Sequence, residues 1–350
     1  MEEQRDIFEM LDIMVVPAFC VRDQVILQVN PAARGLLITP GTPVSELLQT
    51  GAEEYGHFTG GCLYLTLRIS GASHGAVINR VNGLDVFVLE QELPQKELSS
   101  LALAARELRE PLSGVMLSAE RLFPTVQGGE AASLNRNLYR LLRIVGNMAD
   151  AESFSTGSHQ ETVNISSLIR EIFEKAQEAL SRSGTELQYE CPEESIYCLA
   201  DTQQLERAIL NMLSNASKFT PKGGRIRAEL TRQGRTLRIS VTDSGSGIPE
   251  DMLPTLFTRY LRRPTLEDSR QGIGLGMVLI RSAAANHGGA VLIDRPSGNL
   301  TRVTMTLVIR QSSESILRSP LLFTDYSGER DHTLVELSES LSAELYQPQF

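Results

Sequence analysis

The sequence predicts a multidomain α+β protein, and three observations carry that prediction. The chain of 350 residues is long for one core and suits two or three domains. Short alternating apolar runs between turn residues come first, apolar residues at helical spacing follow, and helices then alternate with strands. These changes of period predict segments at residues 1–92, 93–157, 158–311 and 312–350.

The composition argues against several classes of function. A net charge of −10 and an aromatic content of 5%, without Trp, disfavour a nucleic-acid partner, because such binding requires a basic surface. No apolar run approaches the ~20 residues that span a bilayer, and the acidic start "MEEQRDIFEM" lacks the features of a signal peptide. The four cysteines form no CxxC pair, which favours reduced thiols. We therefore expect a cytoplasmic protein.

Residues 1–92 are expected to form a small antiparallel sheet. "PAFCVRDQVILQVN" predicts a β-hairpin that turns at Arg22 and Asp23, and "NPAARGLL" predicts a short helix. Three further strands are predicted in "GCLYLTLRIS", "HGAVINRV" and "LDVFVLEQ", separated by "GAS" and "NG" turns. This order of elements resembles a PAS-type sensor domain, which has helices on one face of its sheet. An unrelated α+β domain would give the same pattern and stays open.

Residues 93–157 are expected to form a helical hairpin. Apolar residues recur at spacings of three and four along the first helix, at Leu98, Leu101, Ala105, Leu108, Leu112, Met116 and Ala119. "FPTVQGGEA" then breaks the helix. The second helix carries a similar stripe at Leu134, Leu138, Leu141, Val145 and Met148. Two helices cannot bury both stripes alone, so we expect dimerisation into a four-helix bundle.

Residues 312–350 are expected to form an acidic C-terminal segment. Between residues 311 and 350, seven acidic residues face two basic ones, so about half of the net charge lies there. Asp331 is placed to cap an amphipathic helix. Its shared apolar face would consist of Leu334, Leu337, Leu341 and Leu345. A helix docked on the rest of the protein is the first interpretation, and a partner-binding segment is the second.

The stretch "LERAILNMLSNASKFTPKGG" predicts a helix with one polar face. Its buried stripe would consist of Leu205, Ile209, Met212 and Ala216. Asn211 and Asn215 are four residues apart and therefore share a face. An amide oxygen there can help to hold Mg²⁺, which prefers oxygen ligands, and Lys218 is near enough to meet phosphate charge. Taken alone, two asparagines on a helix are more often simply solvated.

Two glycine-marked stretches follow. In "LRISVTDSGSGIP" a strand ends at Asp243, and Gly245 and Gly247 let the backbone turn close to a flat ligand, although a plain turn would look alike. A carboxylate at that strand end can accept the exocyclic amine of adenine.

In "RQGIGLGMVLIRSAAANHGG", the glycines Gly272, Gly274 and Gly276 lead into an apolar helix, whose N-terminus can bind phosphates. The spacing matches neither a dinucleotide fingerprint nor a Walker motif. At the end of the same stretch, His287 and the two glycines after it resemble the C-terminal cap of a helix. This histidine is therefore expected to be structural.

Together these stretches resemble the ATP-binding domain of sensor histidine kinases, an α/β sandwich in the wider class of chaperone and gyrase ATPases. "NMLSNASKFTPKGG" resembles the N box of that family, "DSGSGIP" the G1 box, "LFTRYLR" the F box and "GIGLGM" the G2 box. The resemblance covers residues 95–310 and implies ATP and Mg²⁺ as cofactors. It implies Mg²⁺ ligation by Asn215, phosphate contacts by Asn211 and Lys218, and adenine recognition by Asp243. The glycines would shape the phosphate loop and a lid between residues 257 and 272.

The hairpin departs from the family at the phosphate acceptor. "RELREPL" resembles the acceptor motif, yet Arg106 stands where the family has histidine. A guanidinium stays protonated at any accessible pH and cannot attack a phosphate as imidazole does. Glu107 therefore has no histidine to activate, and Glu110 replaces the Thr or Asn that would position water for phosphatase action. No histidine lies between residues 94 and 157.

The sequence thus predicts a cytosolic, dimeric histidine-kinase relative that binds ATP and Mg²⁺ but cannot phosphorylate its own hairpin. Such a pseudokinase would pair with itself or with a full histidine kinase in a two-component pathway, and a response regulator is a further candidate partner. Two alternatives remain. One is a module in which nucleotide occupancy sets a shape that a partner reads, and the other is a serine kinase of the anti-sigma-factor type.

Overall fold

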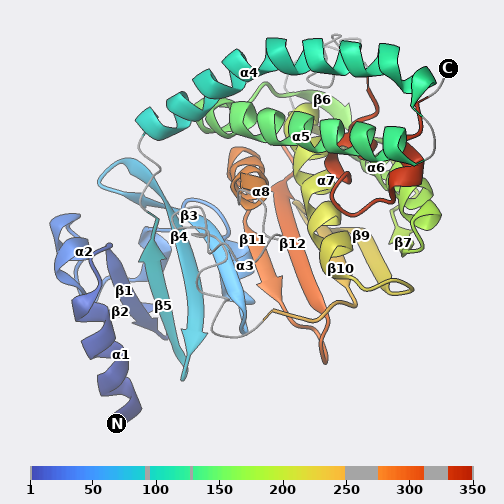
Figure 1. Ribbon diagram of the computed structural model, residues 1–350. Coiled ribbons are helices and arrows are strands. Elements are labelled where there is room, and N and C mark those ends of the chain that lie inside the picture. Colours follow the sequence, from blue (N-terminus) through green and yellow to red (C-terminus); the bar gives the residue numbers. More distant parts are fainter. Residues whose placement is uncertain (1, 91–94, 127–128, 249–274, 311–329, 349–350) are drawn as a thin grey trace.

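The computed structural model describes residues 2–90, 95–126, 129–248, 275–310 and 330–348 (Figure 1). Its described strands form a ten-stranded sheet in the order β2-β1-β5-β4-β3-β11-β12-β10-β9-β7. Neighbouring strands are antiparallel except for β7 and β9, which run parallel. A separate pair joins β6 to β8.

The strands have the following bounds: β1 Ala18–Arg22, β2 Val25–Val29, β3 Cys62–Ile69, β4 Ala72–Val81, β5 Leu84–Leu89, β6 Glu161–Asn164, β7 Glu186–Glu190, β8 Tyr197–Ala200, β9 Arg225–Gln233, β10 Thr236–Asp243, β11 Val291–Asp294 and β12 Thr301–Val308. The helices are α1 Glu2–Ile13, α2 Pro31–Gly35, α3 Ala52–Gly56, α4 Gln95–Leu122, α5 Glu130–Thr156, α6 Ile165–Arg182, α7 Thr202–Phe219, α8 Leu275–Asn286 and α9 His332–Glu336, with 3-10 turns at Val44–Glu46, Phe123–Thr125 and Ala343–Tyr346.

The N-terminal half-sheet, β2-β1-β5-β4-β3, contains the five strands expected between residues 1 and 92. The turn between β4 and β5 lies at the predicted Asn82 and Gly83, whereas the first hairpin turns one residue later than predicted, because Arg22 still belongs to β1. Asp23 and Gln24 between β1 and β2, and Asn82 and Gly83 between β4 and β5, all have positive φ, as tight hairpins require. Asn30 caps the short helix α2 by accepting a hydrogen bond from the backbone N–H of Ala33 at 2.9 Å.

Helix α1 was not expected from the sequence. Ile7 and Leu11, one turn apart, are buried against Ala18, Cys20 and Val86 of the first half-sheet. The start of the chain is thus a docked amphipathic helix as well as an acidic segment.

The two half-sheets are joined edge to edge. β3 pairs with β11 in antiparallel register, with Leu63 opposite Leu292. Their cores interlock, since Leu292 and Ala290 pack into the N-terminal core, while Cys62 and Tyr64 belong to the core of the C-terminal half. Residues about 230 positions apart in the chain therefore share one continuous sheet (Figure 1).

Helices α6, α7 and α8 cover the C-terminal half-sheet, and α4 and α5 lie across them (Figure 1). Leu98, Ala151, Leu275 and Val278 form a small core where α4 and α5 meet α8. Among the described residues, every helix is too short or too polar to cross a lipid bilayer. The four cysteines are free thiols, as their spacing predicted.

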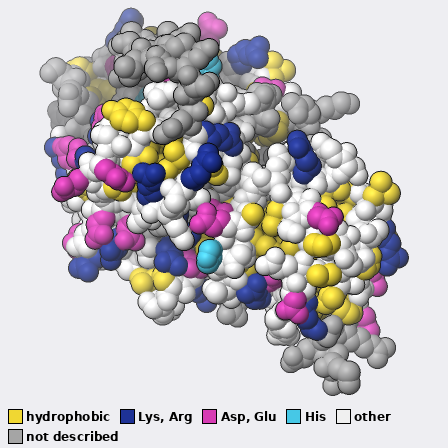
Figure 2. Space-filling view, turned by 180° about the vertical axis from the view of Figure 1, so that it is seen from behind, with side chains coloured by type: hydrophobic (Ala, Val, Ile, Leu, Met, Phe, Trp, Pro, Cys, Tyr) yellow, Lys and Arg dark blue, Asp and Glu magenta, His cyan; other side chains and the backbone are white. Residues whose placement is uncertain are grey.

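The described face in Figure 2 mixes basic and acidic side chains without a continuous area of one sign.

Candidate functional site

Helix α7 carries three of the residues singled out by the sequence. Asp201 starts the helix by accepting a hydrogen bond from the backbone N–H of Gln204 at 3.0 Å. The predicted apolar stripe is buried throughout, at Leu205, Ile209, Met212 and Ala216. Packing of that stripe on the sheet fixes the helix, so that Asn211, Asn215 and Lys218 lie on its other faces.

Asn211 is fully buried and links several elements. Its Nδ2 donates to the backbone oxygen of Arg207 at 2.9 Å and to Oε2 of Glu336 at 3.3 Å. Its Oδ1 accepts from Nη2 of Arg143 at 3.2 Å. Gly276, in the first turn of α8, lies so close that a Cβ there would be 2.7 Å from the same Oδ1. Glycine at this position therefore lets α8 begin directly against α7.

Asp243 ends strand β10 with a buried carboxyl group. Its Oδ1 accepts a hydrogen bond from the backbone N–H of Gly245 at 2.9 Å. Burial raises the pKa of Asp243 to about 6, and the Gly245 hydrogen bond opposes that rise. The carboxyl is therefore ionised at neutral pH at a desolvation cost, which a donor such as an adenine amine would offset.

The turn after β10 lies against the end of α7. A Cβ at Gly245 would be 2.6 Å from Oδ1 of Asp243 and 2.7 Å from the backbone oxygen of Phe219. Gly247 has a φ of +74°, and a Cβ there would be 3.2 Å from the backbone oxygen of Asn299. Both glycines therefore permit a close approach that a side chain would block. The turn after β10 thus lies at the end of α7, and the start of α8 lies against Asn211 farther back on the same helix.

Other predicted residues lie apart from these segments or outside the described residues. Gly272, Gly274, the F-box stretch 256–262 and the expected lid at 257–272 fall outside the described residues. Arg106 and Glu107 are exposed on α4. His287 is structural, as predicted, because its Nε2 accepts from the backbone N–H of Asp201 at 3.0 Å and its ring is buried.

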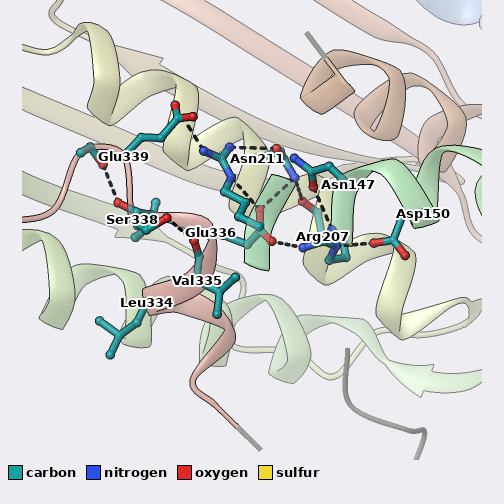
Figure 3. Close-up of polar contacts among 12 residues, drawn as sticks. Asn147, Asp150, Arg207, Asn211, Leu334, Val335, Glu336, Ser338 and Glu339 are labelled. Carbon is teal, nitrogen blue, oxygen red and sulfur yellow. Dashed lines mark hydrogen bonds and ion pairs between the residues drawn. The ribbon is translucent and has the colours of Figure 1, made fainter. Parts of the chain in front are cut away.

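Sequence reasoning missed a buried cluster of charged residues beside Asn211 (Figure 3). Arg207 is completely buried; it donates from Nε to Oδ2 of Asp150 at 2.6 Å and from Nη2 to Oδ1 of Asn147 at 2.8 Å. Its Nη1 donates to the buried carboxylate of Glu336. Arg143 donates from Nε to the other oxygen of Glu336 at 3.2 Å. We call Asp150, Arg143, Arg207 and Glu336 the buried ionic cluster.

A second carboxylate lies next to the cluster. Oε2 of Glu339 is 3.2 Å from Nζ of Lys218 and 3.3 Å from Nη1 of Arg143. Burial alone would raise the pKa of Glu339, but Arg143, Lys218 and Arg140 outweigh it and hold that pKa below its ordinary value. Two residues of the candidate site, Asn211 and Lys218, thus each contact a carboxylate of the C-terminal segment.

The sequence did contain a signal for this cluster. Arg207 lies one turn before Asn211 on the same face of its helix, and Arg143 interrupts the apolar run "LLRIV". Glu336 likewise sits among the apolar residues of "TLVEL". A charged residue within an apolar run is expected to have a buried partner, although the pattern does not say which one.

Comparison with known proteins identifies the domain that contains Asn211, Lys218 and Asp243. Residues 200–311 match the family described as histidine kinase-, DNA gyrase B-, and HSP90-like ATPase. The sensor protein KdpD of Clostridium acetobutylicum is 27% identical over 251 residues, which cover 64% of this chain and 27% of KdpD. The adaptive-response sensory kinase SasA of Crocosphaera subtropica is 27% identical over 236 residues, which cover 63% of this chain and 61% of SasA.

Among solved structures, full-length ShkA in complex with AMPPNP aligns with a TM-score of 0.49 and 24% identity, over 61% of this chain and 46% of that one. The chain matches between 27% and 61% of the length of the two curated relatives. The matching ATPase model and the kinase relatives agree with the resemblance that the N-box and G-box stretches indicated. Residues 200–311 thus form a histidine kinase-, DNA gyrase B- and HSP90-like ATPase domain, and the chain as a whole is similar to sensor histidine kinases over somewhat less than two thirds of its length.

Proposed function

We propose that this protein binds ATP and Mg²⁺, does not phosphorylate itself on the hairpin, and acts through a partner in a two-component pathway. The observation that carries the proposal is Arg106. It is exposed on α4 at the acceptor position, and no histidine occurs anywhere in α4 or α5. An arginine side chain offers no lone pair to attack a phosphate.

Nucleotide binding is supported by the polar residues of α7 and the end of β10. Asp243 supplies a buried acceptor for an adenine amine, and Asn211 and Lys218 supply donors toward phosphates. Asn215 is half-buried on the same helix, and its amide oxygen is a hard ligand of the kind Mg²⁺ takes. The ion would neutralise part of the phosphate charge, while these side chains bind and orient the nucleotide.

Dimerisation is supported by the exposed apolar side chains of the hairpin. These side chains are between 45% and 59% exposed, and they comprise Leu103, Leu108, Val115, Leu117 and Leu122 of α4 with Leu134 and Leu141 of α5. A helical pair with this much exposed apolar surface gains stability when a second hairpin covers it. A second copy of this chain or a related kinase would form the four-helix bundle.

The partner of the proposed pathway is a protein that carries the missing acceptor. A paired kinase with its own histidine would receive phosphate in trans or be held inactive, and a response regulator would then read the outcome. We place the N-terminal half-sheet as a PAS-like sensor of a cytosolic signal. A serine kinase of the anti-sigma-factor type is less well supported, because the long hairpin has no role in that chemistry.

Incubation of the full chain with Mg²⁺ and γ-labelled ATP tests the proposal. We expect no label on the wild-type chain and acid-labile label on Arg106→His, since Glu107 is already in place beside it. Arg106→Gln is the matched control and should stay unlabelled. Acid-labile label on the wild type would overturn the proposed loss of self-phosphorylation, and acid-stable label would place the protein among serine kinases.

A further inference from the structure

The C-terminal segment 330–348, here called the tail, lies between the hairpin and the ATP-binding domain (Figure 1). Val335 is buried against Leu142 of α5, and Leu337, Leu341 and Tyr346 belong to the core that contains α6 and α7. The ring of Tyr346 packs edge-on against Tyr139 at 5.0 Å. These apolar contacts hold the tail in one place on both neighbours.

Polar side chains of α5 hold the backbone of the tail. Arg140 donates to the carbonyl oxygens of Ser338 and Glu339 at 3.2 and 3.1 Å, and Arg136 donates to that of Leu341 at 3.3 Å. Asn135 donates to the carbonyl oxygen of Tyr346 at 2.9 Å. One face of the hairpin therefore binds successive carbonyls of the tail, which fixes where its side chains point.

The two carboxylates of the tail that point inward reach the candidate nucleotide site. Glu336 contacts Asn211 (Figure 3). Glu339 contacts Lys218. Arg143 of α5 binds both carboxylates, so the hairpin and α7 share them. Asn211 and Lys218 are the residues of α7 to which the resemblance assigns the phosphates. The carboxylates of the tail thus occupy the same donors that the phosphates would need.

We propose that the tail is an autoinhibitory segment, in which Glu336 and Glu339 occupy the phosphate end of the nucleotide site and must move before the phosphates of ATP can bind there. This inference rests on the proposed function of the site. A polyphosphate and two carboxylates carry the same sign, and at contact distance within a partly buried site they cannot share the same cations. Release of the tail would also remove the bridge between α5 and α7.

Binding of trinitrophenyl-ATP with Mg²⁺ to the full chain tests the inference. Glu339→Gln keeps the shape of the side chain and removes its charge from Lys218 and Arg143. We expect this variant to bind the nucleotide about five- to tenfold more tightly than the wild type, a coupling of ordinary size. Glu344→Gln is the matched control, because Glu344 lies in the same tail but is exposed, and its affinity should equal that of the wild type.

Amide hydrogen exchange gives a second readout that does not depend on any substitution. Residues 332–342 of the wild-type chain should exchange faster when Mg²⁺ and trinitrophenyl-ATP are added, because the tail then leaves its site. Equal affinities in all three proteins, with unchanged exchange in the tail, would overturn the autoinhibitory role and leave nucleotide binding intact. Failure of all three proteins to bind the nucleotide would instead reject the proposed function, and the inference with it.

Discussion

Two arginines on two helices of this chain, Arg106 and Arg207, differ sharply in how far the surrounding structure constrains them. Arg106 on α4 is exposed and stands where the histidine kinase pattern has its acceptor. Arg207 on α7 is completely buried and binds Asp150, Asn147 and Glu336. The acceptor position can change without disturbing any packing, whereas the nucleotide helix is tied to three other segments. A substitution at the exposed position is therefore expected to disturb the fold less than one within the buried ionic cluster.

The largest expected effect would follow removal of the buried cation. Arg207→Met keeps most of the side-chain bulk but leaves Asp150 and Glu336 buried without their shared partner. We expect the free energy of unfolding to fall by about 3–5 kcal/mol, as for other broken buried ion pairs. Urea denaturation followed by circular dichroism measures this change. A loss below about 1 kcal/mol would show that the cluster does not constrain α7, which would remove the contrast with α4.

The next effect concerns Asp243 and nucleotide affinity. Asp243→Asn keeps an acceptor for the N–H of Gly245 but removes the charge offered to an adenine amine. We expect affinity for trinitrophenyl-ATP to fall about 10- to 100-fold, the range for one charged hydrogen bond. Asp294→Asn is the matched control, since Asp294 also ends a strand but pairs with Arg302 on the surface. Equal losses in both variants would contradict the assignment of Asp243.

The pH dependence of nucleotide binding sharpens the same assignment. Because burial raises the pKa of Asp243 to about 6, the carboxyl gains a proton as the pH falls from 7.5 to 5. Only about one tenth of it is ionised at pH 5, so affinity should fall about tenfold over that range. The Asp243→Asn variant should not show this fall in affinity when it is titrated in parallel. Titration of the nucleotide phosphates affects both proteins equally, so the difference between the two curves reports Asp243 alone.

The contribution of Asp243 to folding stability changes with pH in the opposite direction to nucleotide affinity. A raised pKa means that the folded state binds the proton more tightly than the unfolded state does. The contribution of Asp243 to stability is therefore fully present below its unfolded pKa, near 3.8, and is lost as the pH rises through about 6.

The smallest expected effect belongs to the exposed arginine. Arg106→Ala should change the free energy of unfolding by less than about 0.5 kcal/mol, as is usual for surface substitutions. The same urea titration measures it, beside Arg207→Met. A loss above about 1 kcal/mol would mean that Arg106 has acquired a structural role, and that the acceptor was replaced for stability.

Local features of the fold could be predicted from the sequence, because short-range chemistry determines them. The turns at Asp23 and Asn82 follow from residues that tolerate positive φ, and the buried stripe of α7 follows from its spacing. The pairing of β3 with β11 could not be predicted, since alternation identifies a strand without identifying its neighbour.

The tail shows where a correct local signal was not sufficient. Asp331 caps α9 through the N–H groups of Thr333 and Leu334, but the helix ends at Glu336, well short of the face expected to extend to Leu345. The carbonyls that would continue the helix instead accept hydrogen bonds from Arg140 and Arg136 of α5. A tertiary partner thus replaced the helical hydrogen bonds.

In the candidate site, too, some residues could be predicted from short motifs and others could not. Asn211, Asp243 and Gly245 belong to short motifs, and the structure brings their segments together. The partners of Asn211, at Arg143 and Glu336, come from positions far away in the chain. No spacing rule connects such positions, so only the folded structure reveals that the tail shares the site.

The strand pairing between β3 and β11 limits how the N-terminal half of this protein can be removed or exchanged. Cutting away the N-terminal half-sheet would expose the backbone edge of β11 together with the apolar side chain of Leu292. Such an edge is a template for pairing with other chains, so the truncated protein would tend to aggregate. A chimera with a different N-terminal domain would therefore need a substitute strand at the same edge.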